Sequence, residues 1–286
     1  MAPKKLVAPI SLLLFALSHT VLLNAADFYS DFTITWGGGR ATIYNGGEDL
    51  QLMMDRASGS GGESKTAFLF GRFDVQIKLI PGNSTGTVTT FYLQSRSPYQ
   101  DEIDFEFLGS NSSYVLHTNI YTGGNGGREQ QFHFWFDPTA DFHTYSILWN
   151  PQQIIWYVDG IPIRVFKKAN VSEVAYLENQ PMKIHASLWD GSNWIGPIDW
   201  SKAPFIAHYH GYSYTACVWT GSENRYGLVT CNNNGTGNNW MNKVLSEDEK
   251  NKIEMVQKKY MFYTYCNKST GGNRSESTII ECSINT

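Results

Sequence analysis

Residues 101 to 107 read Asp-Glu-Ile-Asp-Phe-Glu-Phe, and from Glu102 onward acidic and large apolar residues alternate strictly. Successive side chains of a β-strand point to opposite faces of the sheet. Three carboxylates, those of Glu102, Asp104 and Glu106, therefore share one face of the predicted strand, and three apolar side chains share the other. This pattern predicts a sheet strand with a buried aromatic side and a carboxylate-bearing side.

Neighbouring carboxylates repel each other, and this repulsion separates their pKa values. Retaining glycoside hydrolysis needs such a pair, an ionised nucleophile and a protonated acid whose carboxyl groups lie ~5–5.5 Å apart. At ~3.3 Å per residue, the backbones of Glu102 and Glu106 are roughly 13 Å apart, and their long side chains can lean together. Asp104 is shorter and is placed to bias one neighbour. The alternative is the solvated outer face of an ordinary strand, and spacing alone does not assign the roles.

The rest of the chain predicts a β-sandwich. Short alternating runs, such as 50–54, 71–79 and 154–158, stand between turn signals from about residue 27 to 215. Asp159-Gly160 after the third run is a strong hairpin signal. Strands at this spacing are typical of an all-β sandwich.

The N-terminus has the layout of a secretory signal peptide. Lys4 and Lys5 precede an apolar run over 6–23, and small residues follow it. This layout predicts a signal peptide over residues 1–26 with cleavage near Ala25 or Ala26. The alternative is a single membrane anchor, since the run approaches spanning length.

Four cysteines occur in the last quarter of the chain, and secretion implies that they form disulfides. Of three possible pairings we predict the nearest-neighbour one, Cys217–Cys231 and Cys266–Cys282, which closes two short loops. Zinc-ligand spacing is absent from the sequence. Six glycosylation sequons agree with secretion: Asn83, Asn111, Asn170, Asn234, Asn267 and Asn273. The net charge of −4 offers no basic surface for nucleic acid.

One helix is predicted after the sandwich. Ser246 and Glu249 form a capping box, and Ile253, Val256 and Tyr260 then recur at helical spacing. A final strand over 260–265 leads into the last cysteine pair. We therefore expect a catalytic domain over 27–215 and a disulfide-stabilised extension over 216–286 that docks on it.

Several segments together carry a family resemblance. They are 101–109, 117–119, 128–132, 135–139, 142–150, 162–164, 180–182 and 200–205. In this order they resemble the plant xyloglucan endotransglucosylase/hydrolases of glycoside hydrolase family 16, over nearly the whole mature chain. The resemblance implies an all-β, curved two-sheet β-jelly-roll sandwich with an open substrate cleft. It also implies a short C-terminal extension with one helix and two disulfides.

The resemblance implies a role for each of the three carboxylates. It implies that Glu102 is the nucleophile and Glu106 the general acid/base, with Asp104 tuning the pair. It further implies glucan contacts from Glu106, His117, Thr118, Asn119, Gly127, Arg128, Glu129, Asn193, Trp194, Gly196 and Arg274. The sequon after the strand places a predicted glycan on Asn111.

The implied activity is that of a secreted xyloglucan endotransglucosylase of the apoplast, which remodels the cell wall. It would cleave the β-1,4-glucan backbone with retention and transfer the fragment to another xyloglucan chain. The alternatives are an endohydrolase of xyloglucan or mixed-linkage glucan, and a non-catalytic polysaccharide-binding sandwich. We expect donor and acceptor polysaccharides as partners, a monomer, and no metal, organic cofactor, nucleic acid or membrane partner after signal cleavage.

Three departures from the family pattern surround the strand. Gln100 stands where the family usually has His, and an amide cannot titrate near neutrality. The stretch 189–200 is short, and Ser192-Asn193 replaces an acidic pair. The C-terminal Arg-Phe-Pro motif is missing, so Arg274 is assigned the role of its arginine.

Overall fold

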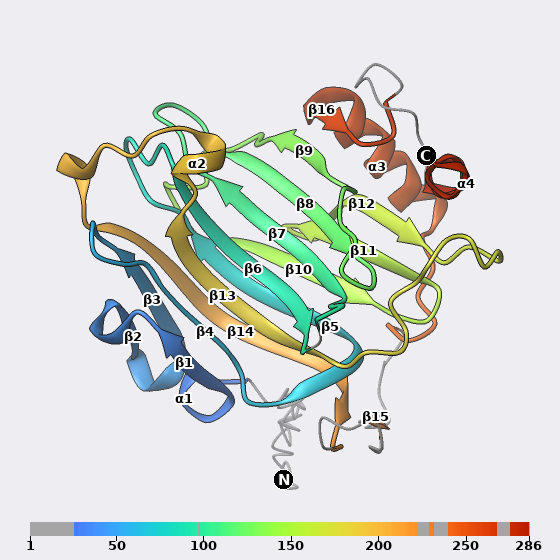
Figure 1. The fold of residues 1–286 in the computed structure, drawn as a ribbon, viewed down its shortest axis with the longest axis horizontal. Helices are drawn as coiled ribbons and strands as arrows, with labels where there is room; N and C mark the ends of the chain where they lie inside the picture. Colours follow the sequence, from blue (N-terminus) through green and yellow to red (C-terminus); the bar gives the residue numbers. More distant parts are fainter. Residues whose placement is uncertain (1–25, 97, 222–228, 232–239, 268–274, 286) are drawn as a thin grey trace, which may run out of the picture.

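Two curved β-sheets lie face to face in the computed structural model (Figure 1). The structure describes residues 26–96, 98–221, 229–231, 240–267 and 275–285. The predicted signal peptide up to Ala25, the sequons at Asn234 and Asn273, and Arg274 lie outside these residues.

The front sheet in Figure 1 holds the carboxylate strand near its middle. Its strands are antiparallel, in the order β1 (Phe32–Trp36), β4 (Ser60–Ser64), β13 (Met182–Asp190), β6 (Thr87–Ser95), β7 (Glu102–Leu108), β8 (Val115–Tyr121), β9 (Gln130–His133) and β16 (Met261–Thr264). The run 101–107 therefore forms a strand, as its alternation predicts.

The back sheet consists of β2 (Ala41–Tyr44), β3 (Asp49–Met54), β14 (Phe205–Trp219), β5 (Ala67–Lys78), β10 (His143–Trp149), β11 (Gln153–Val158) and β12 (Ile161–Lys167), and β15 (Val229–Cys231) pairs with β14. One residue pair, Met182 and Phe68, joins the two sheets. Asp159 and Gly160 form the predicted turn between β11 and β12, with φ angles of 49° and 73°.

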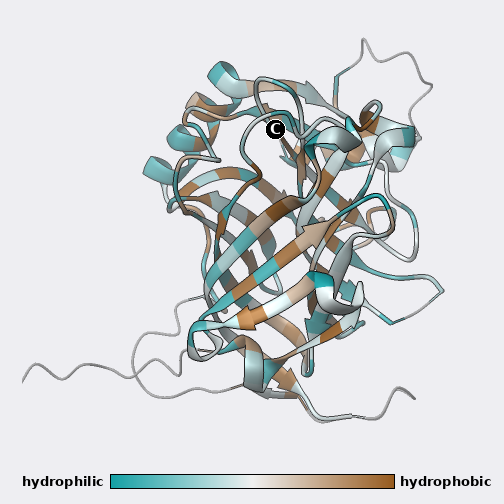
Figure 2. Ribbon diagram, turned by 90° about the vertical axis from the view of Figure 1, so that its left-hand side faces the viewer, coloured by the Kyte–Doolittle hydropathy of each residue, from teal (hydrophilic) through white to brown (hydrophobic). Residues whose placement is uncertain are grey.

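The core fills the space between the sheets. Buried and partly exposed residues alternate along β3 and β5, and Figure 2 shows the matching alternation of apolar and polar segments along the strands. Phe105 and Phe107 on the inner face of β7 pack against Tyr145 of β10, with ring centroids 5.7 Å and 4.6 Å apart. This apolar inner face fixes the register of β7, so its carboxylates must face outward.

Helices lie at the ends of the sheets. They are α1 (Phe28–Asp31), α2 (Ser192–Ile195), α3 (Glu247–Tyr260) and α4 (Glu276–Asn285), with short 3₁₀ helices at Gly38–Arg40, Asn45–Gly47 and Trp200–Lys202. The capping box predicted at Ser246 starts α3, and buried Ile253 and Val256 form its packed face. Within the described ranges, no helix is both long and apolar enough to cross a membrane.

The C-terminal extension agrees with its prediction and adds one element. Both disulfides form with the predicted pairing, Cys217–Cys231 and Cys266–Cys282. The predicted helix corresponds to α3, and α4 is a second helix that carries Cys282. Strand β14 passes through residue 215, so the extension predicted from residue 216 begins on a strand of the back sheet.

Candidate active site

Each of the three carboxylate residues of β7 pairs in register with one polar residue on β6 and one on β8. Their β6 partners are Gln94, Tyr92 and Thr90, and their β8 partners are Tyr121, Asn119 and His117. The sheet alternation places all of these side chains on the outer face of the front sheet. The site is therefore a polar surface built on three adjacent strands, with an aromatic core directly beneath it.

Glu106 is held from the β8 side. Its Oε2 lies 2.6 Å from Nδ1 of His117, whose side chain is 3% exposed. The indole of Trp194 on α2 approaches the imidazole edge-to-face, with ring centroids 5.3 Å apart. Nε2 of His117 is buried and has no hydrogen-bond partner within the described chain. Glu106 thus has a fixed orientation toward β8.

Glu102 is held from the opposite side. The amide of Gln94 on β6 donates a hydrogen bond to its Oε2, and the carboxyl of Asp104 hydrogen-bonds to it as well. Burial raises the pKa of Glu102 above its usual value, while the hydrogen bonds from Asp104 and Gln94 oppose this rise. These two donors favour the ionised carboxylate that a nucleophile requires.

Asp104, between them, is buried at 3% exposure. Burial, and then the neighbouring charges of Glu102 and Glu106, hold its pKa well above the usual range. A protonated Asp104 has a hydroxyl to donate to Glu102, which explains how the two carboxyl groups can share a hydrogen bond. Burial and the flanking charges therefore favour the protonated form of the middle member of the trio.

A buried arginine supports the strand from behind. Arg164 on β12 is 1% exposed, and its guanidinium lies 4.8 Å from the ring centroid of Trp156. That indole donates a 3.0 Å hydrogen bond to the backbone carbonyl of Asp104. Burial lowers the pKa of Arg164 to about 10, so it remains charged at neutral pH. Its positive charge opposes the rise in the pKa of Asp104.

The predicted contacts on β8 divide between the two faces of the sheet. His117 and Asn119 lie on the carboxylate face, where Oδ1 of Asn119 accepts 2.9 and 3.0 Å bonds from the amides of Ile120 and Arg128. Thr118 points to the inner face, is fully buried, and accepts a 2.8 Å bond from Arg164. The structure therefore places Thr118 beneath the site rather than on it.

The predicted contacts at 127–129 lie in the turn that connects β8 to β9. Gly127 has a φ of +82°, which favours glycine. Nε of Arg128 donates to both carboxylate oxygens of Glu281 on α4 at 2.9 Å. The backbone carbonyl of Glu129 accepts a bond from Tyr265. The C-terminal extension thus holds this turn in place.

The predicted contacts at 193–196 lie on and after α2. Asn193 is exposed and Trp194 is 48% exposed, while Gly196 ends the helix with a φ of +111°. Trp194 stacks at 6.4 Å on Trp189 of β13 and bridges to His117. The short loop therefore places an accessible aromatic face beside Glu106.

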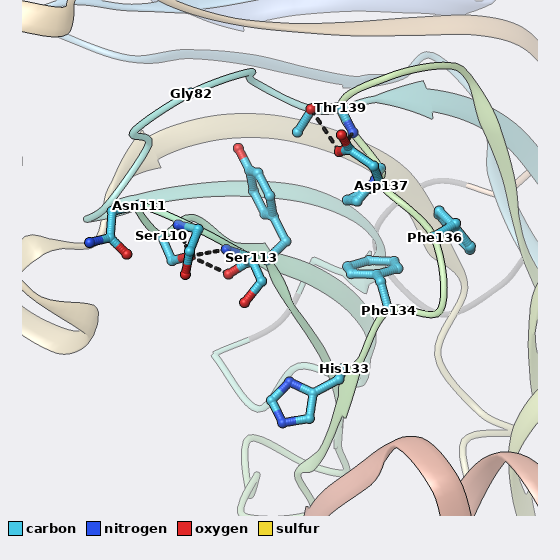
Figure 3. Close-up of a pocket in the computed structure, with 12 residues that line it drawn as sticks. Gly82, Ser110, Asn111, Ser113, His133, Phe134, Phe136, Asp137 and Thr139 are labelled. Carbon is cyan, nitrogen blue, oxygen red and sulfur yellow. Dashed lines mark hydrogen bonds between the residues drawn. The ribbon is translucent and has the colours of Figure 1, made fainter.

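A separate pocket lies at the far end of β7. It has a volume of about 420 Å³ between the loop after β7 and the segment after β9, and its lining includes none of the three carboxylates (Figure 3). Asn111 borders it but points away from Phe134 and Phe136, and the residue is exposed. Glycosylation of Asn111 remains a prediction. Gln100, before β7, accepts a 2.8 Å bond from Gly124 through its backbone.

Three residues of the site were not identified from sequence. Polar residues alternate with Phe91 and Leu93 along β6, a signal that could have found Gln94. Arg164 and Glu281 gave no such signal, because their partners are 36 and 153 positions away in the chain. Long-range pairing of this kind is not visible in a local pattern.

Comparisons with known proteins agree with this geometry. The sequence model of the glycosyl hydrolases family 16 matches residues 28–204. The chain is 49% identical over 250 residues to xyloglucan endotransglucosylase protein 7 of Diospyros kaki, covering 85% of this chain and 92% of that protein. It is also 49% identical over 263 residues to the putative xyloglucan endotransglucosylase/hydrolase protein 13 of Arabidopsis thaliana, covering 90% and 91%.

Among solved structures, the Bacillus licheniformis β-glucanase superposes with a TM-score of 0.55 at 25% identity, covering 64% of this chain and 91% of that one. The Crh5 transglycosylase superposes with a TM-score of 0.53 at 22% identity, covering 66% and 81%, and shows the fold alone.

Proposed function

Since the chain belongs to glycosyl hydrolases family 16, among the plant xyloglucan endotransglucosylase/hydrolases, we propose that it is a xyloglucan endotransglucosylase. It cleaves the β-1,4-glucan backbone of one xyloglucan chain and transfers the fragment to another. Two disulfides and the apolar N-terminal run support secretion, with the apoplast as the site of action.

The first chemical step forms a covalent intermediate. A carboxylate oxygen of Glu102 attacks the anomeric carbon, and the bond from that carbon to the glycosidic oxygen breaks. Glu106 gives its proton to the departing oxygen, which leaves as the hydroxyl group of the released chain. The neutral Asp104 donates to the Glu102 carboxylate before the attack and thus orients the nucleophile.

The second step reverses the first with a new partner. Glu106, now ionised, removes a proton from a hydroxyl group of the acceptor chain. That oxygen attacks the anomeric carbon, and the ester bond to Glu102 breaks. Water in place of the acceptor gives hydrolysis by the same steps. Transfer is favoured here because a relative at 49% identity is named a xyloglucan endotransglucosylase, and others at 49% are named endotransglucosylase/hydrolases.

One observation carries the proposal: the two outer carboxylates are held in opposite directions. Glu102 is bound toward β6 by Gln94, and Glu106 is bound toward β8 by His117. A glycosyl ester on Glu102 then extends over β6 and β13, and the leaving or accepting chain lies over β8 and β9. His117, Asn119 and Trp194 contact sugars on that second half, together with the turn at 127–129, while Thr118 acts from beneath. The glucan contact predicted for Arg274 falls outside the described residues.

The test is incubation of the secreted protein with xyloglucan, with and without labelled xyloglucan oligosaccharides. We expect label to enter the polymer without a matching rise in reducing ends. A rise in reducing ends without incorporation identifies a hydrolase instead.

Two variants test the carboxylate roles in the same assay. Glu102→Ala removes the nucleophile and Glu106→Gln removes the proton donor, so each is expected to lower transfer by more than about 1,000-fold. Activity that survives both substitutions would contradict the assignment, and intact binding without turnover in the wild type would favour the binding-only alternative.

A further inference from the structure

One buried side chain lies beneath both the carboxylate strand β7 and the turn that connects β8 to β9. Arg164 of β12 is 1% exposed and lies between the two sheets. Its guanidinium is a planar fork whose N–H donors have a fixed geometry. Among the described residues, its hydrogen bonds go to two backbone carbonyls and to the hydroxyl of Thr118. The fork therefore binds the backbone of the site from below.

The first nitrogen of the fork binds β8. Nη1 donates to the backbone carbonyl of Thr118 at 2.9 Å and to its hydroxyl at 2.8 Å. Thr118 stands between His117 and Asn119, whose side chains lie on the opposite, carboxylate-bearing face of the sheet. A displacement of Thr118 moves both neighbours, because the three residues share one stretch of backbone.

The second nitrogen of the fork binds the turn at 127–129. Nη2 donates to the backbone carbonyl of Arg128 at 2.6 Å. The amide of Arg128 donates to Oδ1 of Asn119 at 3.0 Å, so its amide and its carbonyl are both held. Because Nη1 and Nη2 belong to one rigid plane, the fork fixes the position of the turn relative to β8.

The same guanidinium reaches β7 through an indole. It lies 4.8 Å from the ring centroid of Trp156, and that indole donates a 3.0 Å hydrogen bond to the backbone carbonyl of Asp104. Cation–π contacts of this kind are strongest where both partners are desolvated, as they are here. Arg164 thus relates three segments that are far apart in the chain: β7, β8 and the turn at 127–129.

We propose that Arg164 is a positioning residue that keeps the acceptor side of the site aligned with the carboxylates, and that it thereby favours an acceptor hydroxyl over water. The inference rests on the proposed function, because that function places the accepting chain over β8, β9 and this turn. A hydroxyl on a polymer must be held in line with the ester on Glu102, whereas a water molecule needs no such support. A loosened turn should therefore harm transfer more than hydrolysis.

Arg164→Lys tests the inference through the partition between acceptor and water. Lysine keeps the charge, but its ammonium lacks the planar fork that joins the two carbonyls. Label incorporation and reducing ends would be measured in the same reaction. We expect the ratio of transfer to hydrolysis to fall by about 10-fold and the KM for the acceptor to rise by a similar factor. Thr118→Val, which removes only the hydroxyl, should act in the same direction by less.

An activated aryl glycoside of a xyloglucan oligosaccharide separates positioning from general damage. Its leaving group is a single ring, so its hydrolysis depends on Glu102 and Glu106 without a long chain over the turn. We expect Arg164→Lys to change this hydrolysis by less than about 3-fold. Phe28→Leu is the matched stability control, because Phe28 is buried against Phe32 of β1 at the edge of the front sheet. It should lower the unfolding temperature and leave the ratio unchanged.

A wild-type ratio in Arg164→Lys, or an equal loss of transfer and of aryl glycoside hydrolysis, overturns the inference. If Arg164→Lys does not fold, Thr118→Val decides by the same two criteria. Failure of label transfer by the wild type refutes the proposed function instead. Calorimetry of a xyloglucan oligosaccharide on Glu102→Ala, with and without Arg164→Lys, then still tests the positioning role, and equal affinities would overturn it.

Discussion

Asp104 can influence the ionisation of Glu102 without itself reacting with the substrate. Its carboxyl is buried between two others, so the neutral form is strongly favoured. A neutral carboxyl can donate a hydrogen bond to Glu102, whereas an ionised one would repel it. We therefore propose that Asp104 acts as a hydrogen-bond donor to Glu102, held in place by its burial.

Substitution of Asp104 distinguishes the donor role from a charge role. Asp104→Asn keeps a donor and stays neutral, so kcat should remain within about 10-fold of wild type. Asp104→Ala loses a hydrogen bond to a charged group, about 1.5–3 kcal/mol, which corresponds to roughly 10- to 100-fold in kcat. Steady-state kinetics on xyloglucan with a labelled acceptor provide the measurement. If Asn proved as damaging as Ala, Asp104 would have to act as an anion.

The raised pKa of Asp104 also predicts a pH dependence of stability. Between the unfolded pKa of about 3.9 and the raised folded value, the folded protein holds a proton that the unfolded chain has lost. The contribution of this group is thus fully present below about pH 4 and declines as pH rises through that window. Urea unfolding over a pH series should show a smaller decline for Asp104→Asn; parallel curves for the two proteins would refute this.

Among the elements, the short helix α4 connects the C-terminal extension to the turn after β8 and to β12. Cys282 ties it to Cys266, and the neighbouring Glu281, 3% exposed at its side chain, pairs with Arg128 in the turn after β8. Asn285 accepts a 2.6 Å bond from the amide of Lys167 on β12. This helix therefore fastens the turn that carries three predicted glucan contacts.

Loss of the buried pair should destabilise the fold measurably. Glu281→Ala leaves a partly buried guanidinium without its carboxylate, and we expect the free energy of unfolding to fall by about 3 kcal/mol. Asp248→Ala is the matched control, because it breaks a 2.6 Å pair with Lys252 that is exposed on α3 and should cost less than about 0.5 kcal/mol. Urea unfolding measures both. Similar losses for the two variants would argue against a structural role for α4.

The elements also show which features a sequence can reveal. Strand β7 and helix α3 follow from local patterns, namely strict alternation and a capping box. The same alternation separates Thr118 from His117 and Asn119, so its inward orientation could have been derived from sequence. The pairing of α4 with the turn at Arg128 could not, because it depends on a contact between residues 153 positions apart.

At the scale of the whole molecule, the strands differ in how deeply they are buried. Every residue of β11 is buried, and most of β10 is buried too, whereas β15 pairs along one side and its residues are largely exposed. Resistance to local opening follows burial and hydrogen bonding. The centre of the back sheet, at β10 and β11, is therefore expected to resist local opening, and β15 at its edge is expected to open readily.

Hydrogen exchange measured by mass spectrometry should reproduce this order. Amides of β10 and β11 are expected to exchange most slowly, those of β7 at an intermediate rate, and those of β15 and α4 most rapidly. Reduction of both disulfides should accelerate exchange in β15 and α4 with little change in β11. Faster exchange in β11 than in β15 would contradict the assignment of β10 and β11 as the most stable part of the sandwich.

The opposed attachments of Glu102 to β6 and of Glu106 to β8 have a consequence for a load-bearing polymer network. In the proposed transfer, the half of a cut chain that is esterified to Glu102 cannot drift away while the other half departs and a replacement arrives. Each completed transfer leaves the number of chains in the network unchanged, although their lengths are redistributed. Such a material can relax under tension and regain its connectivity, whereas hydrolysis would leave a permanent break.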